Sequence, residues 1–322
     1  MPSDRLLALL LIAVALSRLP FLDAAYGANI DAWRVARVAR QMAETGVYEV
    51  SRFPGYPAQE IVSSWIWRGG PWALNAASAI CSVAAVWAFV ACARRAGSPD
   101  ALLAGLAFAM TPVFFVNSVT AKDYVWALAF VLGSLSSILR RRPMIAGLLL
   151  GLGIGCRITS VPMLLPLGLI LFREMDKPQR WRAVAGSGLT TFAATGIVFA
   201  PVWMRHGTSF FTFYENHARP DMWDVALRFS RQVWGSVGLI GWAAVFIGMA
   251  FRFSRKHEQP ASLPLPHNPF FVPALGLIIV IYGAAICVCQ IRRAISFRSS
   301  LRRWCSRAAL RRRSVFGSAV FA

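Results

Sequence analysis

Six charged side chains lie in the loops between apolar segments or at the ends of those segments, where a membrane protein can bring polar groups to a substrate. They are two carboxylates, Asp31 and Asp123, and four cations, Arg34, Arg52, Lys122 and Arg157. A carboxylate can remove the proton of an acceptor hydroxyl, and cations can stabilise a phosphate leaving group. A sugar carried on a lipid phosphate needs both kinds of group beside an apolar groove, so the pattern points to chemistry on such a donor.

Each of these positions also has a purely structural explanation. Asp31 begins a predicted helix, where Asp is a favoured N-cap residue. Lys122 and Asp123 would anchor a helix end at the membrane interface, and Arg157 would extend its long side chain to the membrane surface. Against this, ionisable groups at the membrane boundary tend to face a cavity, and the planar fork of Arg suits phosphate. The sequence leaves both explanations open.

The composition places these residues in an α-helical membrane protein. Of the 322 residues, 57% are hydrophobic and only 15% are charged, and the mean hydropathy is +0.54. Several apolar runs approach the roughly 20 residues that cross a bilayer, so we predict an all-α, multi-pass bundle of about nine spans. The expected spans are 5–22, 72–93, 100–119, 122–139, 143–157, 160–172, 183–203, 232–251 and 269–290. The first is interpreted as an uncleaved helix because it has no clear small-residue cleavage site.

The net charge of +20 indicates membrane topology rather than nucleic-acid binding. Basic residues fall mostly in short clusters between apolar spans, and such clusters stay on the cytoplasmic side. With the N-terminus inside, four clusters are inside: 94–95, 140–142, 173–182 and 252–256. The loops 23–71 and 204–231 and the tips near 120 and 158 then face outside. This topology predicts a plasma-membrane protein with its active site on the extracytoplasmic side.

Two parts of this topology need comment. The short spans 143–157 and 160–172 are predicted as a hairpin, and a single helix kinked at Pro162 is the alternative. The tail 291–322 holds nine Arg and no acid, and we predict that it is disordered after a transmembrane domain of residues 1–290. The six Cys show no zinc-binding spacing and are interpreted as small apolar side chains.

The first extracytoplasmic loop, 23–71, contains a predicted amphipathic helix at 31–44. Its apolar face would hold Ala32, Val35, Val38, Ala39, Met42 and Ala43, and its polar face Arg34, Arg37, Arg40, Gln41 and Glu44. This pattern is typical of a helix that lies in the membrane interface. Gly46 is expected to end the helix, and the turn at 53–57 returns the chain toward the membrane.

Four stretches together carry a family resemblance over residues 5 to about 205. They are Asp31 with its surface helix and Gly46-x-Tyr48, the motif SRFPGYP at 51–57, Thr111-Pro112 with Asp123 opening an apolar helix, and the Gly/Leu hairpin with Arg157 at its tip. In the order and spacing of these stretches the chain resembles the GT-C superfamily of polyprenyl-phosphate-sugar-dependent glycosyltransferases. Within it, the chain looks like the dolichyl-phosphate-mannose protein mannosyltransferases and the lipid A aminoarabinose transferases.

The resemblance implies a multi-pass transferase with a polyprenyl-phosphate-sugar donor and a lipid, glycan or protein acceptor. Asp31 would be the catalytic base, Asp123 the acid of the second loop, and Arg157 the basic hairpin residue near the donor phosphate. As further cations of the same outward face, Lys122, Arg34 and Arg52 are the other candidate phosphate ligands. Inverting and retaining transfer both remain open.

The chain departs from that family in its first loop, where Asp31 is followed by Ala32 instead of a second acid. No ligand set for a metal follows from the spacing, so we expect no cofactor, with a divalent metal as the alternative. The lone acid and the unusual tail leave a truncated or non-catalytic relative open. A transporter or lipid-handling protein is the third hypothesis, and it would require charges deep within spans, discontinuous helices and internal repeats.

Overall fold

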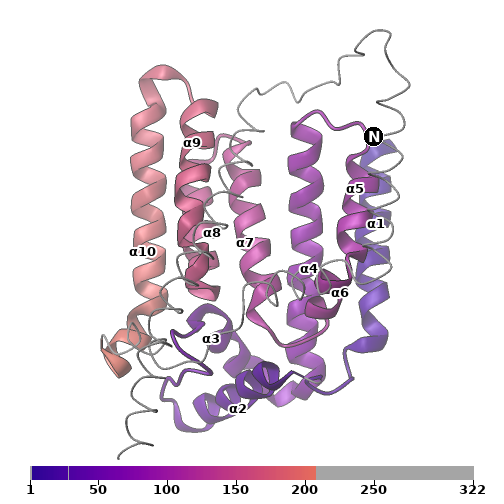
Figure 1. Cartoon of the computed structure of the whole chain (residues 1–322), viewed down its shortest axis with the longest axis vertical. Coiled ribbons are helices and arrows are strands. Elements are labelled where there is room, and N and C mark those ends of the chain that lie inside the picture. Colours follow the sequence, from indigo (N-terminus) through magenta and orange to yellow (C-terminus); the bar gives the residue numbers. More distant parts are fainter. Residues whose placement is uncertain (1, 28, 208–322) are drawn as a thin grey trace, which may run out of the picture.

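The computed structural model describes residues 2–27 and 29–207, which form a helical bundle with two helices across one end (Figure 1). The bundle helices are α1 (Pro2–Arg18), α4 (Gly70–Arg95), α5 (Ala101–Met110), α6 (Pro112–Ser118), α7 (Asp123–Ile138), α8 (Pro143–Cys156), α9 (Leu164–Glu174) and α10 (Arg180–His206). The end helices are α2 (Ile30–Thr45) and α3 (Pro57–Ile66). No strand occurs in these residues, so the predicted all-α class is confirmed for them.

The described helices support a membrane protein but not the predicted number of spans. Two helical segments, Pro57–Arg95 and Lys177–His206, are long and apolar enough to cross a bilayer, and α5 with α6 would make a third. The helices α7 and α8 are apolar but shorter. The expected spans 232–251 and 269–290, the loop 204–231 beyond residue 207 and the tail 291–322 lie outside the described residues.

The sides of the bundle carry exposed apolar side chains. Those that are more than half exposed include Leu6, Leu9, Ile12 and Leu16 on α1 and Leu189, Phe192 and Ile197 on α10. Apolar surface on this scale is costly in water and is suited to contact with lipid. The distribution therefore agrees with a bundle that stands in a membrane.

The expected single span at 100–119 is a broken helix. The helices α5 and α6 meet at a bend of 67°, at Pro112, whose ring removes a backbone donor. The fully buried guanidinium of Arg18 donates to the Ala109 carbonyl at 2.6 Å and to Ser118 Oγ at 3.2 Å. Arg18 therefore supplies hydrogen bonds at the break, and the residues predicted as the span 100–119 form two helices that meet at an angle.

The hairpin predicted for 143–172 is confirmed. Arg157 has an extended backbone (φ −153°, ψ 114°) and ends α8, so the chain breaks there and not at Pro162. Arg141, before α8, pairs with Asp176, after α9, at 3.2 Å. The start of α8 and the end of α9 therefore lie at the same end of the bundle, and Arg157 lies at the other end.

Three glycines of α8, spaced four residues apart, let α8 lie close to α10: Gly147, Gly151 and Gly155. A Cβ at Gly147 would lie 2.3 Å from the Ser187 carbonyl oxygen, and one at Gly155 would lie 2.6 Å from Val198 Cγ1. Small residues at this spacing let two helix backbones approach closely. This packing fixes the end of α8 and with it the position of Arg157.

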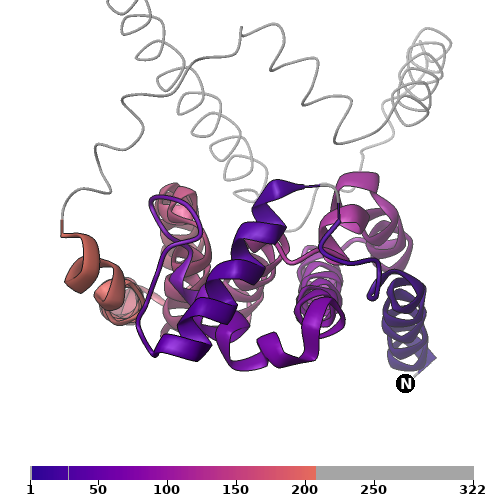
Figure 2. The same ribbon diagram turned by 90° about the horizontal axis from the view of Figure 1, so that it is seen from below.

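The predicted amphipathic helix is α2, which runs across the end of the bundle (Figures 1 and 2). Gly46 ends it with a left-handed backbone (φ 70°), as expected. Its buried face holds Ala36 in place of the predicted Ala43, which is exposed. This face packs on protein, against α3 and on Leu74 and Ala121. The periodicity thus gave the correct helix, but its apolar face contacts the bundle.

Candidate functional site

The side chain of Asp31 is not used as a helix cap. The N-cap of α2 is Asn29, whose Oδ1 accepts the backbone N–H of Asp31 at 2.9 Å. Asp31 lies in the first helical turn, where the helix dipole favours a negative charge. Its carboxylate is therefore available to other groups, and the structural explanation of Asp31 as the cap is contradicted.

Replacing the cap should affect folding and not chemistry. Asn29→Ala is expected to lower the free energy of unfolding by about 1 kcal/mol, because an orphan N–H of α2 loses its acceptor. Asn29→Asp, which keeps an acceptor, should unfold like the native protein. Thermal unfolding of the detergent-solubilised protein measures the difference. Equal stability of Asn29→Ala and the native protein would mean that this cap contributes nothing.

The two predicted carboxylates and two of the predicted cations form one ion-pair cluster. Arg52 donates through Nη1 to Asp31 and through Nη2 to Asp123 Oδ1, the latter at 2.6 Å. Arg157 Nη1 donates to the other oxygen of Asp123, Oδ2. We name Asp31, Arg52, Asp123 and Arg157 the charged cluster. It joins the start of α2, the loop after α2, the start of α7 and the end of α8.

Burial differs across the charged cluster. The Asp123 side chain is only 2% exposed, whereas Asp31 is 23%, Arg52 18% and Arg157 23% exposed. Burial lowers the pKa of the Arg52 guanidinium, but the charge of Asp123, the Tyr56 ring and Asp31 together raise it above its ordinary value. Arg52 is therefore charged at any working pH. Asp123 forms the buried centre of the cluster, and Asp31 lies toward its open side.

Two aromatic rings flank the charged cluster, and the sequence did not assign them a role. The Arg52 guanidinium carbon lies 4.4 Å from the ring centroid of Tyr56, and that of Arg157 lies 4.1 Å from the centroid of Tyr124. Such stacking favours a cation and fixes the plane of its guanidinium. Both rings are next to predicted elements, since Tyr56 belongs to the SRFPGYP motif and Tyr124 follows Asp123.

The other two predicted cations are placed differently. Arg34 is 45% exposed and lies 3.6 Å from Asp31, one helical turn away on α2. Lys122 is 9% exposed and is near enough to Asp31 and Asp123 to interact with both charges. No described residue makes a direct hydrogen bond or ion pair with the Lys122 ammonium. All six predicted residues therefore gather at this end of the bundle, and Lys122 is a nearly buried cation without a direct partner among the described residues.

A third carboxylate, Glu60 on α3, is fully buried next to the charged cluster. Its Oε1 accepts from Ser51 N at 2.8 Å and from Ser51 Oγ at 2.6 Å. Its Oε2 accepts from Tyr48 Oη at 2.5 Å and from Tyr56 N at 3.1 Å. Glu60 thus holds the loop on both sides of Arg52.

The turn of this loop depends on Gly55. Its backbone is left-handed (φ 97°), and its N–H donates to the Arg52 carbonyl at 2.8 Å. A Cβ at Gly55 would lie 3.2 Å from Val50 Cγ1 and 3.3 Å from Tyr48 Oη. Only glycine satisfies both the conformation and the space without strain. The predicted turn at 53–57 is present.

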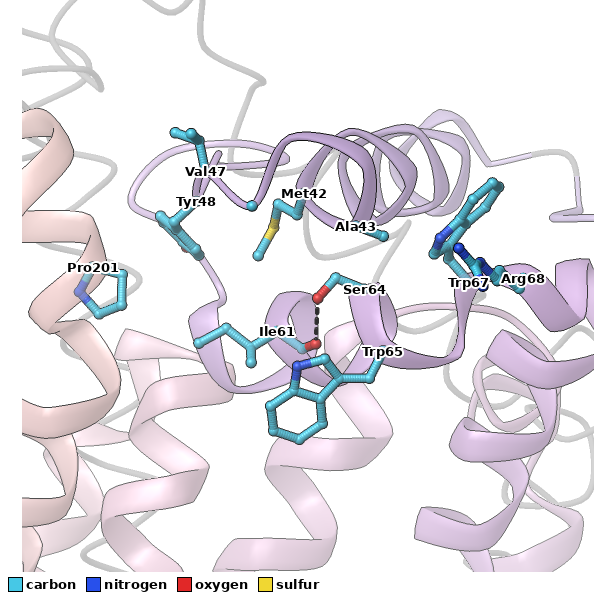
Figure 3. A pocket seen from close by; sticks show the side chains of 11 residues that line it. Met42, Ala43, Val47, Tyr48, Ile61, Ser64, Trp65, Trp67, Arg68 and Pro201 are labelled. Atoms are coloured by element: carbon cyan, nitrogen blue, oxygen red, sulfur yellow. Dashed lines mark hydrogen bonds between the residues drawn. The ribbon is translucent and has the colours of Figure 1, made fainter.

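A cavity of about 540 Å³ lies between α2 and α3 (Figure 3). Its lining combines aromatic side chains with polar ones: Met42, Ala43, Gly46, Val47, Tyr48, Ile61, Ser64, Trp65, Trp67, Arg68 and Pro201. The volume is in the range of small-molecule sites. Tyr48 lines this cavity and donates to Glu60, so the cavity and the charged cluster share one loop. No sequence pattern predicts this cavity, because residues that line it come from three separate helices.

No group of three or more His, Cys, Asp or Glu side chains suited to a metal occurs within 2–27 and 29–207. Both carboxylates of the charged cluster accept from guanidinium groups in this arrangement. The described part of the site therefore supplies donors and acceptors for an organic substrate but no evident ligand set for a cation.

A comparison with known families identifies the enzyme class of the chain. The family model of glycosyltransferase family 87 matches residues 65–310. The chain belongs to glycosyltransferase family 87. It is thus a glycosyltransferase, and its apolar helices agree with a membrane enzyme. No curated protein and no solved structure matches the chain.

The family 87 assignment confirms the predicted membrane glycosyltransferase but not the predicted branch. The branch named from the motifs, protein mannosyltransferases and aminoarabinose transferases, is not the family that the match assigns. Asp123 and Arg157 fall inside the matched residues 65–310, whereas Asp31 and Arg52 precede them. The transporter hypothesis loses its basis, because the matched family is one of transferases.

Proposed function

We propose that the protein transfers a sugar from a polyprenyl-phosphate donor to an acceptor on the extracytoplasmic face of the plasma membrane. Asp31 accepts the proton of the acceptor hydroxyl, and Arg157, Lys122, Arg52 and Arg34 bind the donor phosphate. The lipid chain of the donor would contact the apolar sides of the bundle. The single observation that supports this proposal best is that these residues, taken from four distant segments, meet around Asp123.

The balance of charge favours an anionic ligand. The charged cluster and Lys122 together hold three cations and two carboxylates, and Lys122 has no direct partner among the described residues. A nearly buried cation is costly unless an anion compensates it. A donor phosphate would supply that anion, with acceptor oxygens for Lys122 and for the planar forks of the arginines.

The proposed reaction requires Asp31 to be released from Arg52. While Asp31 accepts from Arg52, the accepting carboxylate oxygen is occupied and cannot take the proton of the acceptor hydroxyl. The phosphate offers Arg52 a second anionic partner. If Arg52 turns toward the phosphate, Asp31 is free to take the proton of the acceptor while the phosphate leaves the sugar.

Transfer from defined donors tests this function. The purified protein in liposomes is supplied with polyprenyl-phosphate sugars of different sugar identity, each radiolabelled, and in parallel with the corresponding nucleotide sugars. We expect label to pass to an acceptor, with release of polyprenyl phosphate, from one or more lipid-linked donors. Transfer from nucleotide sugars alone would contradict the proposed donor class.

The donor-binding role of Arg157 gives a quantitative expectation. Arg157→Gln should raise the donor KM about tenfold or more, because a charge-assisted hydrogen bond to the phosphate is worth about 1.5–3 kcal/mol. Arg205→Gln is the matched control, since Arg205 lies near the same end but, within residues 2–27 and 29–207, forms its ion pair with Glu49, at 3.5 Å. An unchanged donor KM in Arg157→Gln would remove Arg157 from the phosphate site.

A further inference from the structure

We infer that Glu60 is a positioning residue, which holds the loop after α2 so that Arg52 reaches Asp31 and Asp123 together. The position of Arg52 follows from the fold, whereas the importance of that position for sugar transfer rests on the proposed function. Glu60 itself contacts neither carboxylate and has no place in the proposed chemistry.

Glu60 accepts hydrogen bonds from residues that lie before and after Arg52 in the sequence. Oε1 holds both donors of Ser51, the residue directly before Arg52. Oε2 holds the backbone N–H of Tyr56, whose ring lies under the Arg52 guanidinium at 4.4 Å. Glu60 therefore fixes the backbone before Arg52 and the ring on which its side chain rests.

A carboxylate suits this position for reasons of charge and hydrogen-bond count. All four partners of Glu60 are donors: two backbone N–H groups, from Ser51 and Tyr56, and two hydroxyls, from Ser51 and Tyr48. Only an ionised carboxylate offers acceptors in every direction at this size. An amide would place an NH2 group against a backbone N–H, leaving a buried donor without an acceptor.

A fully buried charge needs compensation, and these donors provide it locally. Tyr48 keeps its proton here, because burial, with the nearby Glu60 charge, raises the pKa of its phenol well above the ordinary range. The loop has a second tie, the pair of Glu49 with Arg205 at 3.5 Å, and Glu49 lies three residues before Arg52. Glu60 differs from it because its hydrogen bonds hold the residue directly before Arg52 and the backbone of the residue whose ring stacks on the Arg52 guanidinium.

Chemical modification of arginine tests this role without a substrate. The full-length protein in detergent is labelled with phenylglyoxal, and the modification rates of Arg52 and Arg157 are measured separately by peptide mass spectrometry. In Glu60→Gln we expect Arg52 to react about tenfold faster, equivalent to roughly 1.4 kcal/mol. The rate of Arg157 should stay unchanged, because Arg157 pairs with the same Asp123 but belongs to α8.

The control variant is Glu49→Gln, which changes an acid of the same loop whose ion pair in the described part of the chain is with Arg205. It should leave the Arg52 rate as in the native protein. Ser51→Ala is the second variant, which removes one donor to Glu60 and keeps the carboxylate, and it should raise the Arg52 rate by a smaller factor. An unchanged Arg52 rate in both Glu60→Gln and Ser51→Ala would overturn the inference. So would an equal rise for Arg52 and Arg157, which would indicate general loosening of the fold.

These outcomes are independent of the proposed function. If a donor other than a polyprenyl phosphate is used, or if Asp31 is not the base, the labelling result still reports where Glu60 places Arg52. In an activity assay, Glu60→Gln should add almost no further loss to Arg52→Gln, because both act through the same guanidinium. Fully additive losses would also contradict the inference.

Discussion

Asp31→Asn is expected to reduce sugar transfer about a thousandfold while the protein remains folded, because general-base catalysis contributes roughly 10²–10⁴ to a rate. The Asn amide oxygen still accepts from Arg52, so the shape of the charged cluster is kept. The amide has no basic oxygen for the acceptor proton. The loss should therefore appear in kcat, with the donor KM close to that of the native enzyme.

The measurement compares initial rates of label transfer in liposomes with thermal unfolding of the same preparations. Glu49→Gln serves as the control, since it removes an acid of the same surface whose ion pair, among the described residues, is with Arg205 and not with the charged cluster. If Asp31→Asn transferred sugar at the native rate, Asp31 would be only a partner of Arg52, and the proposed mechanism would fail. A rise in donor KM without a loss of kcat would instead make Asp31 part of the donor site.

Much of the fold is predictable where a helix has one apolar and one polar face, or where an apolar run is long. The periodicity of 31–44 predicts α2 with its end at Gly46, and the apolar runs predict α4, α7, α8 and α10 within a few residues. The sequence does not predict the break between α5 and α6, because Pro112 lies within a long apolar run. The Ala109 carbonyl at this break accepts a hydrogen bond from Arg18, which is 91 residues away in the chain. Local pattern contains no information about such a contact.

The site was predictable residue by residue but not as a geometry. Charge at the ends of apolar segments or in the loops between them identified all six candidates, and the structure places them at one end of the bundle. Whether Asp31 caps the helix stayed open, because nothing local distinguishes Asn29 from Asp31 as the first acceptor of α2. The links from Arg52 to both acids span 21 and 71 residues, so only tertiary packing brings them together. No local pattern indicates the burial of Glu60, since it depends on four donors from the loop before α3.

Asp123→Asn should reduce both stability and activity, whereas Asp31→Asn should reduce activity alone. The Asp123 side chain is 2% exposed and accepts from two guanidinium groups, one on each oxygen. An amide has one acceptor oxygen and no charge, so Arg52 and Arg157 would face each other with reduced compensation. Breaking a buried ion pair from one side costs about 3–5 kcal/mol, and the partial exposure of both arginines favours the lower figure.

The double variant Asp123→Asn with Arg157→Gln shows whether charge repulsion or lost packing destabilises Asp123→Asn. If repulsion between uncompensated guanidinium groups is responsible, removing one of them should recover part of the stability, so that the double variant unfolds at a higher temperature than Asp123→Asn alone. Purely additive destabilisation would show that Asp123 acts through packing and not through charge. Activity should stay low in either case, because Arg52 and Arg157 are the groups proposed to hold the donor phosphate, and both are held in position by ion pairs with Asp123.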